Sequence, residues 1–148
     1  MNTDKIQGIG TSGFIFNRDG KFLIIRRSLT DDFCAGEWEL PGGGVDHGED
    51  PKESIRREVM EEVGIAVHVG HPLTVFNFMM HENGRQKHVA QIVYLCSIKE
   101  SESVQLSFEH CDYRWVSFRD VENLTIKDMA DVVKDMILSV NSHPIVTL

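Results

Sequence analysis

The alternation of hydrophobic and polar positions near the start of the chain predicts two strands joined by a tight turn. Thr11–Asn17 reads T-S-G-F-I-F-N, a β-rich run. Residues 21–27 read K-F-L-I-I-R-R and are apolar on both faces in the middle, which suits a strand covered on both sides of a sheet. Arg18-Asp19-Gly20 lies between them, and Asp-Gly favours the positive φ angles of a turn.

The next segments show no periodicity. We expect an irregular loop over residues 28–38. Residues 39–51 read E-L-P-G-G-G-V-D-H-G-E-D-P, and this density of Gly and Pro predicts no regular structure. Its glycines would let the backbone approach another group closely.

A helix is predicted over residues 50–64. Asp50 suits the N-cap, Pro51 the first helical position, and Glu53 completes the pattern of a capping box. Gly64 suits the position just after the helix. The apolar stripe recurs every four residues and consists of Ile55, Val59 and Val63.

Three more strands and a second helix complete the pattern. Leu73–Met80 and Val89–Ile98 are β-rich, and Asn83-Gly84 between them predicts a hairpin. Tyr113–Ser117 predicts a short strand.

The last long segment predicts an amphipathic helix that starts at a second capping box, formed by Thr125 and Asp128. Its hydrophobic positions are Ile126, Met129, Val133, Met136, Ile137 and Val140. We therefore expect one α/β (α+β) domain over residues 1–148.

Composition and charge limit the classes of function that the chain can have. The formal net charge is -8, which argues against binding a nucleic acid polymer or a membrane surface, but it allows an anionic small molecule if a cation mediates. The polar start, M-N-T-D-K-I-Q, and the lack of a long apolar run predict a cytoplasmic protein. The odd number of cysteines (Cys34, Cys96 and Cys111) predicts buried or half-buried free thiols.

One stretch, R-E-V-M-E-E-V-G, crowds like charges. Glu58, Glu61 and Glu62 share one helix face at the edge of the apolar stripe, where like charges repel. A solvated face or an ion-pair network would explain such a cluster, but the preceding glycine loop can bring carbonyl groups to the same place. Oxygen ligands of this kind suit Mg²⁺ or Mn²⁺, and Mg²⁺ usually also takes phosphate oxygens of a substrate. The pattern therefore predicts metal-assisted chemistry on a phosphate ester or anhydride.

Residues 43–65 read G-G-V-D-H-G-E-D-P-K-E-S-I-R-R-E-V-M-E-E-V-G-I. This segment resembles the signature of the Nudix hydrolases, GX5EX7REUXEEXGU with U aliphatic, at every defined position. We name it the box. The preceding W-E-L-P-G-G is similar to the usual lead-in of the family. The resemblance implies an α/β/α sandwich with a mixed central sheet, a box loop and helix, and a C-terminal amphipathic helix.

The resemblance also implies a metal site. Glu58 and Glu62 would be the principal ligands of Mg²⁺ or Mn²⁺, and Glu61 would be a third ligand or hold a water. The backbone carbonyl of Gly42 would complete the shell. Glu109, in F-E-H-C-D-Y-R-W, occupies a place where related enzymes carry a glutamate that binds metal or acts as the base. The general base stays open between Glu58 and Glu109.

Further positions would orient the site and the substrate. Arg57 would clamp two carboxylates, with Glu49 supporting it from the loop; the alternative is a plain surface ion pair. Arg27 would hold substrate phosphate, so Arg27 and Glu49 form the expected substrate side of the site. Phe33, Phe78 and Tyr113 are aromatic positions that could stack on a base, or could pack in the core or on the surface.

The implied activity is Mg²⁺-dependent hydrolysis of a diphosphate bond in a nucleoside diphosphate linked to another group. Markers of the oxidised-guanine-triphosphate, ADP-ribose, NADH, diadenosine polyphosphate and coenzyme A branches are absent. This favours a (deoxy)nucleoside triphosphate pyrophosphatase or a broad-specificity enzyme, with an ADP-ribose or nucleotide-sugar pyrophosphatase as the alternative. A diphosphate isomerase and a non-catalytic nucleotide-binding module are the rival classes. Homodimers are common in the family, which leaves a homodimer open for this chain.

Overall fold

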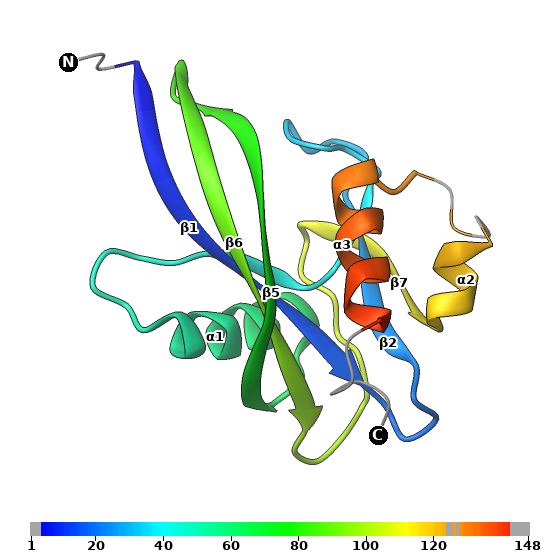
Figure 1. The fold of residues 1–148 in the computed structure, drawn as a ribbon. Coiled ribbons are helices and arrows are strands. Elements are labelled where there is room, and N and C mark those ends of the chain that lie inside the picture. The colour runs from blue at the N-terminus through cyan, green and yellow to red at the C-terminus, as the bar shows by residue number, and fades with distance from the viewer. Residues whose placement is uncertain (1–3, 124–125, 127, 143–148) are drawn as a thin grey trace.

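The fold is a mixed sheet with helices on both faces (Figure 1). The computed structural model describes residues 4–123, 126 and 128–142. The elements are β1 (Lys5–Phe16), β2 (Phe22–Arg27), β3 (Trp38–Glu39), β4 (Gly42–Gly44), α1 (Pro51–Val63), β5 (Val67–Glu82), β6 (Arg85–Ile98), β7 (His110–Val116), α2 (Phe118–Glu122) and α3 (Asp131–Asn141). The predicted α/β class and the mixed sheet are confirmed.

Strand β1 organises the sheet. It pairs in parallel with β6 along its whole length, antiparallel with β4, and with β2 only where Phe16 faces Phe22. The strand order is β3-β2-β1-β6-β5, with β4 paired to β1 and β7 paired to β2. The hairpin between β5 and β6 turns at Asn83 (φ 51°) and Gly84 (φ 74°), as the sequence predicts.

Two hydrophobic cores lie on opposite faces of this sheet. On one face α1 packs Ile55, Val59 and Val63 against Ile15 and its neighbours. On the other face α3 packs its buried residues around Phe14. Figure 1 shows α1 and α3 on either side of the long strands. This alternation along β1 is what the period of two in a strand requires.

The predicted helix over residues 50–64 is confirmed as α1, with one difference at its start. Asp50 caps it by accepting the Lys52 amide (2.8 Å), and Gly64 ends it with φ 70°. The predicted capping box is wrong, because the Glu53 carboxylate pairs with Arg56 one turn later.

Several strand predictions also differ from the structure: β5, β6 and β7 begin six, four and three residues earlier than predicted, at Val67, Arg85 and His110, and the short strand β3 was missed. β1 begins at Lys5, six residues before the predicted strand, because its pairing with β6 overrides the low strand propensity of Gly8 and Gly10. The glycine segment is not wholly irregular, since Gly42–Gly44 forms β4 against β1. Glycine is required at Gly42, because a Cβ there would lie 2.0 Å from the Thr11 carbonyl oxygen.

The C-terminal helix starts later than predicted. α3 begins at Asp131, and Ala130 at its N-cap makes no side-chain cap. The chain cannot be helical at Asp128, which has φ 61° and accepts a hydrogen bond from the Trp38 amide (2.8 Å). Thr125 lies outside the described residues. The helix α2 was missed, although Ser117 and Asp120 form a true capping box there.

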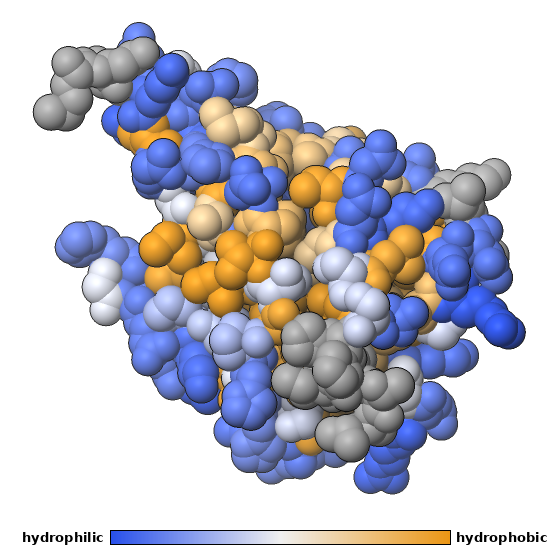
Figure 2. Space-filling model, in the orientation of Figure 1, coloured by the Kyte–Doolittle hydropathy of each residue, from blue (hydrophilic) through white to orange (hydrophobic). Residues whose placement is uncertain are grey.

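The surface carries several exposed hydrophobic side chains. Figure 2 shows hydrophobic residues across the middle of the face on which β5 and α3 lie, and Val75, Met79 and Val132 are the exposed large ones on these elements. No helix within the described ranges has the length and apolar character needed to cross a bilayer. Cys34 and Cys96 are half-buried and buried free thiols as predicted, whereas Cys111 is exposed, because it lies at the start of the outer strand β7.

The packing of α1 predicts a stability effect that separates its two faces. Ile55 is fully buried in the core, so Ile55→Ala should lower the free energy of unfolding by about 2–5 kcal/mol in urea titrations. Met60, on the same helix, is 49% exposed, and Met60→Ala should change it by less than about 0.5 kcal/mol. Equal losses in both variants would contradict the orientation of α1.

Candidate active site

The site forms where α1 meets β4. The amide of Gly42 donates to Glu62 Oε1 (2.8 Å), so the Glu62 carboxylate is fixed to β4. Because all three residues of β4 are glycines, we call it the glycine strand. A Cβ on Gly42 would lie 2.0 Å from the Thr11 carbonyl oxygen. A Cβ on Gly43 would lie 2.5 Å from the Glu58 carboxyl carbon. Glu58 and Glu62 therefore converge on two adjacent residues that carry no side chains.

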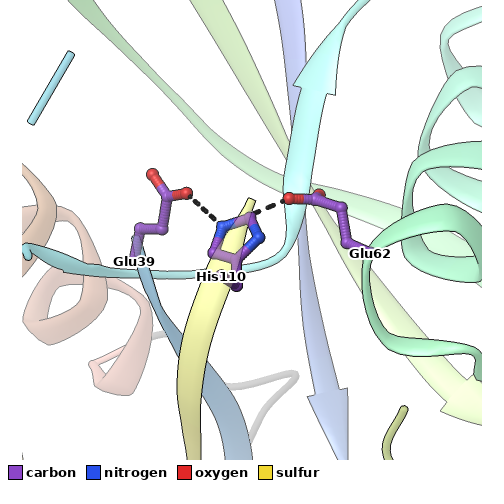
Figure 3. A group of neighbouring side chains, drawn as sticks. All are labelled: Glu39, Glu62 and His110. Atoms are coloured by element: carbon purple, nitrogen blue, oxygen red, sulfur yellow. Dashed lines mark hydrogen bonds and ion pairs between the residues drawn. The ribbon is translucent and has the colours of Figure 1, made fainter. Parts of the chain in front are cut away.

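Glu62 is almost completely buried, with 4% of its surface exposed. Burial, and next the negative charge of Glu39, raise the pKa of Glu62 to about 9. Its Oε2 lies 3.4 Å from His110 Nε2, which is also 3.0 Å from Glu39 Oε1. Figure 3 shows the imidazole lying between the two carboxylates. A buried, largely protonated carboxyl group is suited to exchange its proton for a cation.

Glu39 and His110 are members of this cluster that sequence reasoning missed. One ligand atom from each of Glu39, Glu62 and His110 lies within 4.8 Å of the others. His110 Nδ1 is buried without a hydrogen-bond partner in the described structure. The available signals were weak: Glu39 belongs to the W-E-L-P-G-G lead-in, and His110 follows Glu109.

The structure places Glu58 and Glu61 in different surroundings. Glu58 is mostly buried; burial raises its pKa, and Arg57 opposes that rise. Glu61 has a 58% exposed side chain and lies 3.3 Å from Arg57 Nη1. Glu58 thus faces the glycine strand together with Glu62, whereas Glu61 lies at the outer rim.

Arg57 is the centre of an ion-pair network. Its Nε and Nη2 donate to the two oxygens of Glu49 (2.9 and 3.0 Å), and its Nη1 donates to Glu58 (3.0 Å). The hydrogen bond from Arg57 lowers the pKa of Glu49 to about 2, and the same contact raises the pKa of Arg57. This bidentate geometry holds the box loop on the helix, while a direct role of Glu49 in substrate binding stays a prediction.

Glu109 lies near the cluster but outside its contacts. Its side chain is exposed, and its backbone carbonyl accepts from the Ser28 amide (2.9 Å). Its negative charge raises the pKa of both Glu58 and Glu62, which places it within electrostatic reach. Its role as ligand or base stays a prediction.

A cavity of about 470 Å³ adjoins the cluster and is lined by Glu39, Gly42–Gly44 and Arg27, among others. Arg27 donates to Glu39 (3.1 Å) and Asp31 (3.0 Å), and its guanidinium lies 5.2 Å from the centre of the Phe33 ring. Arg27 therefore faces the cavity with two of its nitrogens engaged, and binding of substrate phosphate by it stays a prediction.

The donors fit a divalent cation. Carboxylates of Glu58 and Glu62, with Glu39 beside them, supply the oxygen ligands that Mg²⁺ or Mn²⁺ prefers. The absence of a Cβ at Gly43 gives room to the Glu58 carboxylate, and its absence at Gly42 gives room to the Thr11 carbonyl. A cation there would replace the proton that Glu62 otherwise keeps and would offset the repulsion among these carboxylates.

Burial of Glu62 predicts a pH-dependent stability in EDTA. The unfolded carboxyl group ionises near its ordinary pKa of 4.5, whereas the folded one keeps its proton until about pH 9. The free energy of unfolding should therefore fall as pH rises between these values. In urea titrations, the free energy of unfolding of Glu62→Gln should fall less steeply with pH than that of the wild type. At pH 9, Glu62→Gln should be the more stable protein. The exposed control Glu100→Gln should follow the wild type; a Glu62→Gln slope equal to that of the wild type would contradict the assignment.

The glycine strand predicts a contrast between neighbouring substitutions. Gly43→Ala should displace the Glu58 carboxylate and weaken Mn²⁺ binding by about 10–100-fold, measured by titration calorimetry. Gly44→Ala is the matched control, since nothing lies within 4 Å of its added Cβ. Equal affinities in the two variants would show that Glu58 is not a ligand.

Comparisons with known proteins agree with this geometry. A family model described as the NUDIX domain matches residues 7–136. A nucleoside triphosphatase, NudI, of Klebsiella pneumoniae is 27% identical, with 74% of this chain and 82% of that protein covered.

Solved structures show the same likeness. The crystal structure of a MutT protein from Methanosarcina mazei superposes with a TM-score of 0.81 at 34% identity, covering 93% of this chain and 94% of that one. A Caenorhabditis elegans Ap4A hydrolase superposes with a TM-score of 0.65 at 26% identity, covering 91% and 95%. The match over most of the chain, together with the intact box, has one consequence: this chain belongs to the Nudix hydrolase family and is a pyrophosphohydrolase of the Nudix type.

Proposed function

We propose that the protein hydrolyses a phosphoanhydride bond of (deoxy)nucleoside triphosphates, with Mg²⁺ or Mn²⁺ held by Glu58 and Glu62. The observation that supports this most is the convergence of these two carboxylates on Gly42 and Gly43, at the edge of a cavity large enough for a nucleotide. The net charge of -8 makes a cation necessary for binding a polyphosphate there.

Each residue has a distinct task in this proposal. A divalent cation held by Glu58 and Glu62 would neutralise charge on the diphosphate and lower the pKa of the attacking water. Glu58, whose pKa burial raises, is suited to take the proton of that water; Glu109 is the alternative base. Arg57 holds Glu49 and Glu58 in fixed positions, and the Gly42 amide fixes Glu62. His110 lies on the inner side of Glu62 and also contacts Glu39.

The choice of substrate rests on two lines of support. The relatives include proteins named as nucleoside triphosphatases, and the markers of several other branches are absent from the sequence. An ADP-ribose or nucleotide-sugar pyrophosphatase is the alternative, since solved neighbours also include an ADP-ribose pyrophosphatase fold at 21% identity.

The rival classes have less support. A diphosphate isomerase would need a reactive cysteine, but burial raises the pKa of Cys34 and Cys96 to about 12, which keeps both thiols protonated. A non-catalytic binding module would not need the full set of box carboxylates that this chain retains.

A release assay tests the proposal. With Mg²⁺, wild-type protein should cleave nucleoside triphosphates in preference to ADP-ribose, nucleotide sugars, dinucleotides and coenzyme A. Glu58→Gln and Glu62→Gln should each lower kcat by about 100-fold or more without loss of fold. Glu53→Gln, on the outer face of the same helix, should keep wild-type activity because Glu53 is exposed and pairs with Arg56, away from the cavity. Activity that survives both active-site substitutions, or that persists in EDTA, would reject the proposal.

A further inference from the structure

The cavity is formed by a decrease in side-chain size along β1. The residues of β1 that face α3 are, in order towards the open end, Phe16, Phe14, Ser12, Gly10 and Gly8. Phe14 fills the core beneath α3, whereas Ser12 and Gly10 line the cavity. The loss of side-chain volume along one face of one strand leaves space directly beside Gly42–Gly44. A base in this space would place its phosphates towards Glu58 and Glu62.

Gln91 of β6 lies across this floor. It is the register partner of Gly10, and a Cβ on Gly10 would lie 1.9 Å from Gln91 Oε1. Its Nε2 donates to the Thr11 carbonyl oxygen (2.9 Å) and to Ser12 Oγ (2.9 Å). The Thr11 carbonyl can only accept, so it fixes which end of the carboxamide is the nitrogen.

Both donors of the Gln91 amide are therefore used, and Oε1 is left as an acceptor. Within the described part of the chain, no hydrogen bond reaches this oxygen, and it lies above a residue with no side chain. The two cationic side chains that line the cavity are engaged in ion pairs, Arg27 with Glu39 and Asp31, and Lys87 with Glu82, and the carboxylate of Glu37 lines it as well. The apolar remainder of the lining includes Phe76, Phe78, Met80 and Val89.

The aromatic wall orients a base against this acceptor. Phe33 and Phe78 stack on each other with ring centres 6.2 Å apart, which is less than the separation of about 7 Å needed to admit a base between them. They therefore form a wall against which a base can lie, and the polar edge of that base meets the cavity floor. Because both hydrogens of its amide nitrogen are used, Gln91 presents a fixed acceptor to that edge, which favours a base with an amino group over one with a carbonyl oxygen at the same place.

We propose that Gln91 is a specificity-determining residue whose Oε1 accepts a hydrogen bond from the exocyclic amino group of the substrate base. This inference rests on the proposed function and narrows its substrate class to nucleotides of amino-bearing bases. A carbonyl oxygen at the same place would face another acceptor, Gln91 Oε1.

The test uses nucleotide pairs that differ at an amino group: CTP and UTP, ATP and purine riboside triphosphate, GTP and ITP. For the base that is cleaved best, wild-type kcat/KM should favour the amino-bearing member by about 10-fold or more. Gln91→Leu should bring that ratio close to one, mainly through KM of the amino-bearing member. Gly10→Ala should do the same, because the added methyl group displaces the carboxamide.

Two controls separate recognition from support of the fold. Gln86→Leu changes the same residue type on the same strand, but Gln86 does not line the cavity, so it should keep the wild-type ratio. If Gln91→Leu lowers kcat/KM equally for both members of a pair, Gln91 only braces Thr11 and Ser12, and the inference is wrong. A wild-type preference for UTP over CTP would overturn it equally.

A binding measurement separates a failure of this inference from a failure of the proposed function. Equilibrium dialysis of the matching nucleosides, which carry no phosphate and therefore need no cation, should show the same preference in the wild type and its loss in Gln91→Leu. If no triphosphate is cleaved but this preference is present, the hydrolase proposal fails and the recognition by Gln91 stands. Equal binding of each pair by the wild type rejects the role of Gln91, whatever the activity.

Discussion

The helix α1, which carries Glu58 and Glu62, lies against β4, whose three residues are all glycines. This contact sets the distances in the rest of the site. Gly42 has no space for a Cβ beside the Thr11 carbonyl, and its amide holds Glu62. Gly43 admits the Glu58 carboxylate in the same way. Because β1 pairs with β4 at these residues, the strand that forms the floor of the cavity also sets the depth of the metal site.

Electrostatics then divides the carboxylates into two groups. Arg57 neutralises the outer group, with Glu49 in a bidentate pair and Glu61 at the rim. Glu62 belongs to the inner group and meets the charges of Glu39, Glu58 and Glu109 in a buried place, which raises its pKa. A cation is the partner that this inner group lacks, and it is also what a polyphosphate requires on an acidic protein.

The sequence was informative at several places where local chemistry decides the structure, although the local capping box of α2 was missed. The cap at Asp50, the stop at Gly64 and the hairpin at Asn83-Gly84 depend on a few neighbouring residues, and all three are confirmed. The strand β4 and the late start of α3 depend on partners far away in the chain, on β1 and on Trp38, so no local pattern indicates them. The site shows the same contrast between local and distant partners. The box glutamates lie close together in the sequence, whereas Glu39 and His110 come near Glu62 only through the fold.

The central claim, that Glu58 and Glu62 hold a divalent cation, is tested most directly by counting bound Mn²⁺. Electron paramagnetic resonance distinguishes free from bound Mn²⁺, so titration of metal-free protein gives the number of sites and their affinity. The account predicts at least one site in the wild type that is lost or greatly weakened in both Glu58→Gln and Glu62→Gln, with unchanged circular dichroism. Equal Mn²⁺ binding in the wild type and both variants would contradict it.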